Sequence, residues 1–121
     1  MIKIKHFMEP VEPDDGTRIW VEPFNLTLDL RDWCGVHHMM SHLGPPKALR
    51  DWFERHPYGY DYFRGKYHEA LADGPYAKAL KDLASAALDE NFTLLHAGDD
   101  PARNVGVAMH EYLSELQAYS G

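Results

Sequence analysis

Asn91-Phe-Thr-Leu-Leu-His-Ala-Gly-Asp-Asp-Pro-Ala-Arg-Asn104 is the stretch that decides the fold, and it leads into an apolar-periodic segment, Val105 to Tyr119. Phe92 to Ala97 is a short apolar run stopped by Gly98, and this pattern is typical of a buried strand. Asp100-Pro101 predicts a helix start, because Asp accepts hydrogen bonds from first-turn N–H groups and Pro lacks an N–H. In α/β domains, a strand that leads into a helix in this way often holds a ligand.

Two more segments have the period of a strand with one buried face. Ile2 to Phe7 alternates apolar and polar side chains, and we expect it to form the first strand. Thr17 to Glu22 is rich in β-forming residues and is closed by Pro23, which suits a second strand. The connection from Glu9 to Gly16 contains two prolines and an Asp-Gly turn, so we expect no helix there.

The remaining segments repeat apolar residues at the helical spacing of three and four. Val36, Met39, Met40 and Leu43 predict a short helix that ends at Gly44-Pro45. Three more helices are predicted from Pro46 to His56-Pro57, from Tyr60 to Asp73-Gly74, and from Tyr76 to Leu88. The last helix should bury Val105, Ala108, Met109, Tyr112 and Leu116. We expect aromatic side chains to form the main helical side of the core, namely Trp52, Phe53, Phe63 and Tyr67.

This order of segments predicts an α/β fold in a single domain, residues 1–121. The predicted sheet is small, with about three strands covered by about five helices. The second and third strands should be parallel, because a long helical crossover between them suits a right-handed parallel connection. The pairing of the first strand stays open, since its connection can reach either end of a neighbouring strand.

The charge and the cysteine content limit the classes of partner. The net charge is −7, and the twelve Lys and Arg residues are scattered singly, which argues against nucleic acid and against an anionic membrane surface. The single Cys34 cannot form an internal disulfide, and no signal peptide or long apolar span is present. We therefore expect a cytoplasmic protein, and no sequence feature points to a cofactor.

Four residues near one another in sequence raise the question of a metal site: Cys34, His37, His38 and His42. His38 and His42 are one helical turn apart. If the apolar stripe of the same segment faces the core, these two histidines point to solvent, and no third ligand is spaced to join them. We therefore expect no native metal, and Cys34 has no sequence signature of a reactive thiol.

Three stretches together resemble a bacterial family, the domain of unknown function 488, in its short form. The first is Asp15-Gly-Thr-Arg-Ile-Trp-Val21, and the second is Leu49-Arg-Asp-Trp-Phe53 with His56-Pro57 and the later Phe63 and Tyr67. The third is Leu94-Leu-His-Ala-Gly-Asp-Asp-Pro-Ala-Arg-Asn104. The resemblance covers nearly the whole chain and implies an α/β fold, without an established activity.

The chain also departs from the family pattern. Where the family typically continues Asp-Arg-Leu-Trp-Pro-Arg-Gly after the second strand, this chain reads Glu22-Pro-Phe-Asn-Leu-Thr-Leu28. In the later loop the family usually has Lys-Asp-x-x-His-Asn, and here Asp99 replaces the Lys while Arg103 replaces the His. Compared with the family pattern, this chain has fewer cations and one more carboxylate at these two loops. The resemblance therefore implies that an anion site there would be altered or lost.

The loop after the third strand supplies the first candidate ligand residues, Asp99, Asp100, Arg103 and Asn104. We expect the last three on the first turn of the final helix, where free N–H groups and the helix dipole favour an anion. The alternative is that Asp100 caps the helix and Arg103 is solvated. Because two carboxylates oppose the dipole, we expect any ligand here to be neutral or cationic at its contacting end, with Asn104 supplying hydrogen bonds.

Three further candidates come from the strands. Arg18 shares a strand face with Glu22, and it either reaches over the carboxyl edge of the sheet toward a ligand or pairs with Glu22. His96 ends the third strand, so it is either an acid or base or a histidine hydrogen-bonded beneath the loop.

Three classes of function remain open. The first is a binding or regulatory module for a small polar molecule between the loops after the second and third strands. The second is a small-molecule enzyme that uses His96, Asp100 and Asn104. The third is an interaction protein without a catalytic site, whose aromatic helices bury against a second copy in a homodimer. A deep polar pocket would favour the first two, and an exposed aromatic patch would favour the third.

Overall fold

A parallel four-stranded sheet forms the centre of the molecule in a computed structural model, which describes residues 1–120. The strands are β1 (Ile2–His6), β2 (Thr17–Trp20), β3 (His38–Met39) and β4 (Phe92–His96). Their order across the sheet is β1-β4-β2-β3, so the last strand in sequence lies between the first two. The helices are α1 (Leu28–Trp33), α2 (Lys47–Arg55), α3 (Tyr60–Asp73), α4 (Ala77–Ala86) and α5 (Val105–Ser120).

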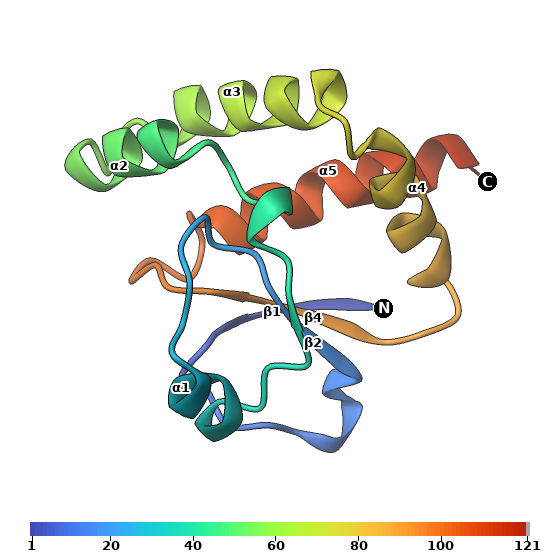
Figure 1. Cartoon of the computed structure of the whole chain (residues 1–121). Helices are drawn as coiled ribbons and strands as arrows, with labels where there is room; N and C mark the ends of the chain where they lie inside the picture. Colours follow the sequence, from blue (N-terminus) through green and yellow to red (C-terminus); the bar gives the residue numbers. More distant parts are fainter. Residues whose placement is uncertain (121) are drawn as a thin grey trace.

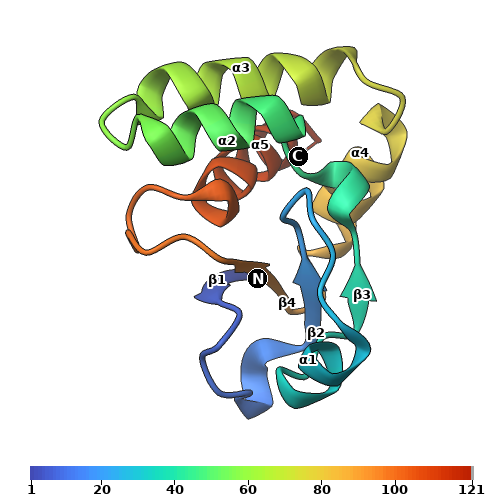
Figure 2. The ribbon, with the colours of Figure 1, turned by 60° about the vertical axis from the view of Figure 1, so that its left-hand side comes forward.

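The sheet separates two layers of unequal size (Figure 1). Helices α2, α3, α4 and α5 lie on one side, and α1 lies on the other with a 3₁₀ turn, Pro13–Asp15. Since side chains alternate along a strand, β2 sends Ile19 to the helical side and Trp20 to the α1 side. The turned view in Figure 2 shows α2 and α3 running side by side above the sheet. All strands therefore end at one edge, near the loop that joins β4 to α5.

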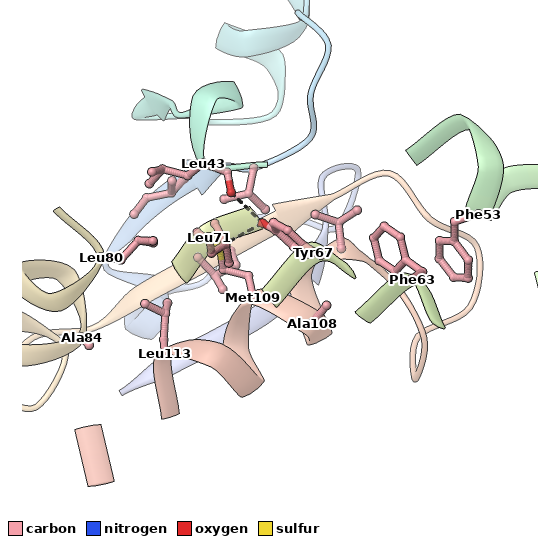
Figure 3. Packing of buried hydrophobic residues seen from close by; sticks show 14 of the residues in the cluster. Leu43, Phe53, Phe63, Tyr67, Leu71, Leu80, Ala84, Ala108, Met109 and Leu113 are labelled. Atoms are coloured by element: carbon pink, nitrogen blue, oxygen red, sulfur yellow. Dashed lines mark hydrogen bonds between the residues drawn. The ribbon is translucent and has the colours of Figure 1, made fainter. Parts of the chain in front are cut away.

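The main core lies between the sheet and α3, α4 and α5 (Figure 3). Phe63 and Tyr67 are fully buried at one-turn spacing on α3, and Phe63 stacks on Phe53 of α2 with ring centroids 4.4 Å apart. The Tyr67 hydroxyl donates to the Leu43 carbonyl at 2.7 Å, so the polar end of this ring is satisfied inside the core. The predicted aromatic core is confirmed for Phe53, Phe63 and Tyr67, whereas Trp52 is only partly buried.

The sheet agrees with the predicted α/β class and adds to it. The parallel pairing of the second predicted strand with the third is confirmed, with Ile19 opposite Leu94. The open question about the first strand is resolved, because β1 pairs in parallel with β4 and Ile4 lies opposite Leu94. A fourth strand, β3, was not predicted. It is two residues long and extends the β2 edge, with His38 opposite Ile19.

The predicted helix from Val36 to Leu43 is wrong. The segment holds β3 and a 3₁₀ turn, Ser41–Leu43. Its apolar residues divide between the two faces of the sheet, with Val36 and Met39 in the α1-side cluster and Met40 and Leu43 in the main core. Four apolar residues at helical spacing also fit an edge strand followed by a turn, and pairing with β2 decides between them.

The predicted start of the last helix at Asp100-Pro101 is also wrong, since α5 begins at Val105. Asn104 caps it, with its Oδ1 accepting from the Val107 N–H at 2.9 Å. Asp100 instead closes a local turn, in which its Oδ1 accepts from the Ala102 N–H at 2.9 Å. Both Asp and Asn are good caps, and the later one lets Val105 reach the core.

We predict that Phe63→Ala lowers the free energy of unfolding by about 3–5 kcal/mol, because the ring is fully buried and stacked on Phe53. Urea denaturation measures this change. Tyr58→Ala is the matched control, since Tyr58 is fully exposed and its loss should change stability by less than about 0.5 kcal/mol. Equal stability of Phe63→Ala and wild type would contradict the assignment of the core.

Candidate functional site

The candidate site lies at the edge where the parallel strands end. In open α/β sheets, ligands bind outside the carboxyl ends of the strands, because loops and helix N-termini converge there. His6 and His96 close β1 and β4 as paired neighbours, and Val21 and Glu22 follow directly after β2. Several polar side chains are buried at this edge, namely Glu22, His96 and Asn104.

Glu22 is a fully buried carboxylate that joins three parts of the chain. One oxygen accepts from Nε of Arg50 on α2 at 2.8 Å. The other accepts from the backbone N–H of Ala97, just after β4, at 2.8 Å. A buried carboxylate needs such partners, because leaving a charge unpaired away from water costs several kcal/mol. The end of β2, helix α2 and the loop after β4 are therefore held at fixed positions.

Arg50 presents the other side of its guanidinium group to a cavity. Its Nε is taken by Glu22, while its Nη1 has only a distant ion pair with the exposed Glu54, at 4.0 Å. No other side-chain partner of Arg50 is present in residues 1–120. The buried carboxylate thus orients a cation whose remaining N–H donors are available to a ligand.

The cavity beside Arg50 has a volume of about 190 Å³. It lies between α2 and the loop from Ala97 to Asn104, and we call it the α2 cavity. Its lining is Arg50, Phe53, Glu54, Pro57, Ala97, Gly98, Asp99, Asp100, Arg103, Asn104 and Val105. Four of the seven candidates predicted from the sequence are brought together here: Asp99, Asp100, Arg103 and Asn104.

Asn104 lines this cavity, yet its hydrogen bonds are made within the protein. Its Oδ1 caps α5, and its Nδ2 donates to the Asp100 carbonyl at 2.9 Å. The residue is 1% exposed. The side chain of Arg103 is mostly exposed, and its Nη1 lies 3.6 Å from an oxygen of Asp100. Arg103 is therefore a solvated side chain, which is the alternative stated above. The loop is therefore stabilised from within, and Asn104 positions it.

A second cavity of about 430 Å³ lies on the other side of the same loop. We call it the histidine cavity, and it is lined by Ile4, His6, Glu9, His96, Gly98, Asp99 and Pro101. Only Gly98 and Asp99 are shared with the α2 cavity. His96 is 4% exposed, and its Nδ1 accepts from the Gly98 N–H at 3.0 Å. His96 is thus hydrogen-bonded beneath the loop, which is the second of the two alternatives stated above for this residue.

The environment of His96 keeps its imidazole neutral near pH 7. The pKa of His96 is lowered to about 4, mainly by burial and also by the nearby His6, while Glu9 opposes the change. Protonation of Nδ1 would also replace an accepted hydrogen bond by two facing N–H groups. The imidazole of folded His96 is therefore uncharged near pH 7.

Arg18 does not lie with the other candidates. It is fully buried on the α1 side of the sheet, where its Nη1 donates to Asp15 at 2.7 Å and its Nη2 donates to the Cys34 carbonyl at 2.9 Å. The predicted alternative of an Arg18–Glu22 pair is wrong, because Glu22 pairs with Arg50. Arg18 also does not reach over the carboxyl edge toward a ligand, because it is fully buried and its hydrogen bonds are made to Asp15, Glu9 and Cys34.

Asp15 is the centre of a cluster of three cations. Lys3 and Lys5 of β1 reach it at 2.9 and 2.8 Å, and Arg18 reaches its other oxygen at 2.7 Å. Burial acts to raise the pKa of Asp15, but hydrogen bonds from these three cations outweigh it and hold the pKa well below its ordinary value. The cluster ties β1 and β2 to the 3₁₀ turn between them.

Sequence reasoning missed Arg50 as a site residue, although two signals were present. Arg50 lies within the second stretch of the family resemblance. Glu22 follows a buried strand, and a carboxylate in that position requires a cation from elsewhere in the chain. Neither signal identifies which arginine pairs with Glu22, because α2 and α3 also carry Arg55 and Arg64.

Two further observations concern metal ligands and membrane-spanning helices in the described part of the chain. Residues 1–120 contain no group of three His, Cys, Asp or Glu side chains placed to hold a metal ion. His38 lies on β3 and His42 in the following turn, so they do not share a helix. None of the described helices has the length and apolar character needed to cross a membrane.

Comparison with known proteins identifies the family of the chain. A family model described as "Domain of unknown function DUF488" matches residues 3–113. The chain belongs to this family. Uncharacterised proteins of Mycobacterium bovis and Mycobacterium tuberculosis are each 27% identical to it over 93 residues, which cover 72% of this chain and 74% of the relative. No solved structure matches the chain.

The DUF488 match includes nearly all of the carboxyl edge. It spans β1, β2, α2, β4 and the first turns of α5, and hence Glu22, Arg50 and His96. The relatives are described only as uncharacterised, so their names indicate no specific function. The function of this DUF488 member therefore has to be argued from its own residues.

We predict that Asp15→Ala lowers the free energy of unfolding by about 3–5 kcal/mol at pH 7, because it leaves the buried Arg18 without its carboxylate. Urea unfolding measures the change. Asp14→Ala is the control, since Asp14 is 60% exposed and also pairs with Lys3, and it should cost less than about 1 kcal/mol. Similar losses for the two variants would show that the cluster is held by surface pairing.

We predict that His96 weakens the fold on acidification between pH 6.5 and 4. In this window the unfolded chain binds a proton that folded His96 does not, so the free energy of unfolding falls as the pH drops, by up to about 3 kcal/mol. Denaturation at pH 7 and pH 4.5 should show a smaller pH dependence in His96→Gln. An NMR titration midpoint of His96 near its ordinary 6.5 would sink this prediction.

Proposed function

We propose that this DUF488 protein is a binding module for a small polar molecule, which occupies the α2 cavity. The observation that carries the proposal is Arg50, a cation fixed by the buried Glu22 with free N–H donors at the cavity. A volume of about 190 Å³ suits a molecule of roughly one ring, because a cavity of about 150 Å³ accepts benzene.

The charges around the cavity favour a ligand without net charge. Two cations, Arg50 and Arg103, face three carboxylates, those of Glu54, Asp99 and Asp100. Arg103 lies near Asp100, and Arg50 is already paired with Glu22. An anion would meet a net negative lining, and its attraction to the dipole of α5 is only about 0.3–1 kcal/mol. We therefore infer a ligand with acceptors for Arg50 and donors for Asp99 or Asp100.

This assignment changes the role expected of Asn104. The sequence suggested that Asn104 gives hydrogen bonds to the ligand, but both ends of its amide are engaged in the loop and the helix cap. Arg50 takes that role in the proposal. Substitution of Asn104 would disturb the loop and so would not report on ligand contact alone.

The other two functions have less support. A homodimer built on the predicted aromatic stripe would need its rings exposed, but Phe63 and Tyr67 are buried in the core, and the exposed rings Tyr58 and Tyr62 lie outside that stripe. An enzyme that uses His96, Asp100 and Asn104 would need them around one cavity, and His96 lines the histidine cavity instead. We keep the cytoplasmic location and the absence of nucleic-acid partners as predictions from charge and composition.

A calorimetric screen of uncharged polar metabolites and phosphate-bearing metabolites tests the proposal. We expect an uncharged compound to bind wild type, and Arg50→Lys to weaken its binding at least tenfold. Lys can keep the charge beside Glu22 but lacks the planar fork of N–H donors. Arg55→Lys is the matched control, because Arg55 ends the same helix without lining the cavity.

Two results would contradict the proposal. Equal affinities of wild type and Arg50→Lys would remove Arg50 from the site. Micromolar binding of a phosphate compound, strengthened by Asp99→Asn, would show that the ligand is an anion and that the charge argument is wrong.

A further inference from the structure

The histidine cavity contains two imidazoles in a defined arrangement that the proposed function does not use. His6 and His96 are paired neighbours on β1 and β4, and their rings meet edge to face with centroids 5.7 Å apart. Both lie at the carboxyl ends of adjacent parallel strands, the usual place for a ligand in this class of fold.

Backbone hydrogen bonds set the tautomer of both rings. The Gly98 N–H donates to Nδ1 of His96 at 3.0 Å, and the Met8 N–H donates to Nδ1 of His6 at 3.2 Å. A nitrogen that accepts a hydrogen bond carries no proton, so each neutral ring carries its proton on Nε2. The cavity is therefore provided with two N–H donors.

The Nε2–H group of His96 has no partner within residues 1–120. The side chain is 96% buried, since its exposed fraction is 4%, and its one hydrogen bond is made by Nδ1. Nε2 is not completely enclosed. In the described residues, the side-chain atom that is both completely enclosed and without a hydrogen bond is Nε of Arg18. Because His96 lines the histidine cavity, its donor reaches that space. A donor that faces a cavity without a protein partner is available to an acceptor on a ligand.

The rest of the lining supplies acceptors. Glu9 and Asp99 bring two carboxylates, and the lining contains no Lys or Arg. Glu9 is held in place, because one of its oxygens accepts from the His6 backbone N–H at 2.7 Å. A carboxylate ligand would be repelled by both acids, and an ammonium ligand would leave the His96 donor without an acceptor.

We propose that the histidine cavity is a second binding site, which takes a neutral amide-type or urea-type group. The carbonyl oxygen accepts from Nε2–H of His96 and His6, and the ligand N–H donates to Glu9 or Asp99. This site is separate from the site proposed in the α2 cavity, because the two linings share only Gly98 and Asp99.

Long-range ¹H–¹⁵N spectra of the ¹⁵N-labelled full chain test the proposal with four small probes. These are acetamide and 2-pyrrolidinone, with acetate and methylammonium as charged analogues. We expect the two amides to shift the Nε2 signals of His96 and His6 saturably at millimolar concentration, with the Nδ1 signals remaining those of an unprotonated acceptor. Neither charged probe should do so. No amide-induced shift, or equal shifts from acetate or methylammonium, would overturn the proposal.

Two substitutions of His96 separate the hydrogen bond from the shape of the cavity. His96→Gln keeps an N–H donor and should bind 2-pyrrolidinone within about threefold of wild type, whereas His96→Phe should lose at least tenfold, read from the His6 signals. Arg55→Lys is the control, because Arg55 is exposed and lines neither cavity, and it should leave this binding unchanged. Full retention by His96→Phe would overturn the proposal. If His96→Phe does not fold, nuclear Overhauser contacts from 2-pyrrolidinone to both histidine rings in wild type decide, and their absence rejects the site.

Discussion

The arrangement of the carboxyl edge depends on the buried carboxylate of Glu22. It bridges Nε of Arg50 and the backbone N–H of Ala97, and so it fixes α2 and the loop after β4 against the end of β2. Three segments far apart in the sequence meet at one side chain that is inaccessible to water. Removing one partner of such a group costs several kcal/mol, whereas a surface pair contributes less than about 1 kcal/mol. The α2 cavity therefore rests on a fixed wall, and this is the condition for a preorganised site.

The two faces of the sheet are stabilised by different means. The helical face is mainly apolar, with Phe63 and Tyr67 in its core, and the Glu22–Arg50 ion pair lies at its carboxyl edge. Within residues 1–120, α1 and a 3₁₀ turn are the helical elements on the opposite face, and α1 buries none of its own residues. Asp15 and its three cations supply much of the order there. Arg18 is needed in that cluster, which explains why a strand arginine is not available to a ligand.

The sequence predicted the fold where a single local period dominates. β1 and β2 alternate, β4 is a short apolar run stopped by Gly98, and α3 keeps one stripe of Tyr60, Phe63 and Tyr67, so their types followed from pattern alone. β3 was missed because its two residues gain their structure from pairing with β2, and no local pattern records that. The start of α5 was misplaced because Asp100 and Asn104 are both good caps, and the packing of Val105 chooses between them. For the candidate site, the pattern indicated the loop residues that line the α2 cavity, but not Arg50 or the buried place of Arg18, which depend on ion pairs between distant segments.

The loop between β4 and α5 connects these observations, since it forms a wall of both cavities. It is fixed at one end by the Gly98 N–H on His96 and at the other by the capping bonds of Asn104. The first turn of α5 must also approach the strands closely. A Cβ at Gly106 would lie 2.9 Å from a methyl group of Ile4 and 3.2 Å from the His96 ring, so only glycine fits without moving them. A larger residue at position 106 would displace His96, and through Gly98 it would shift the wall of the α2 cavity as well. The tight packing of α5 on β1 and β4 is thus what places the walls of two cavities on a single loop.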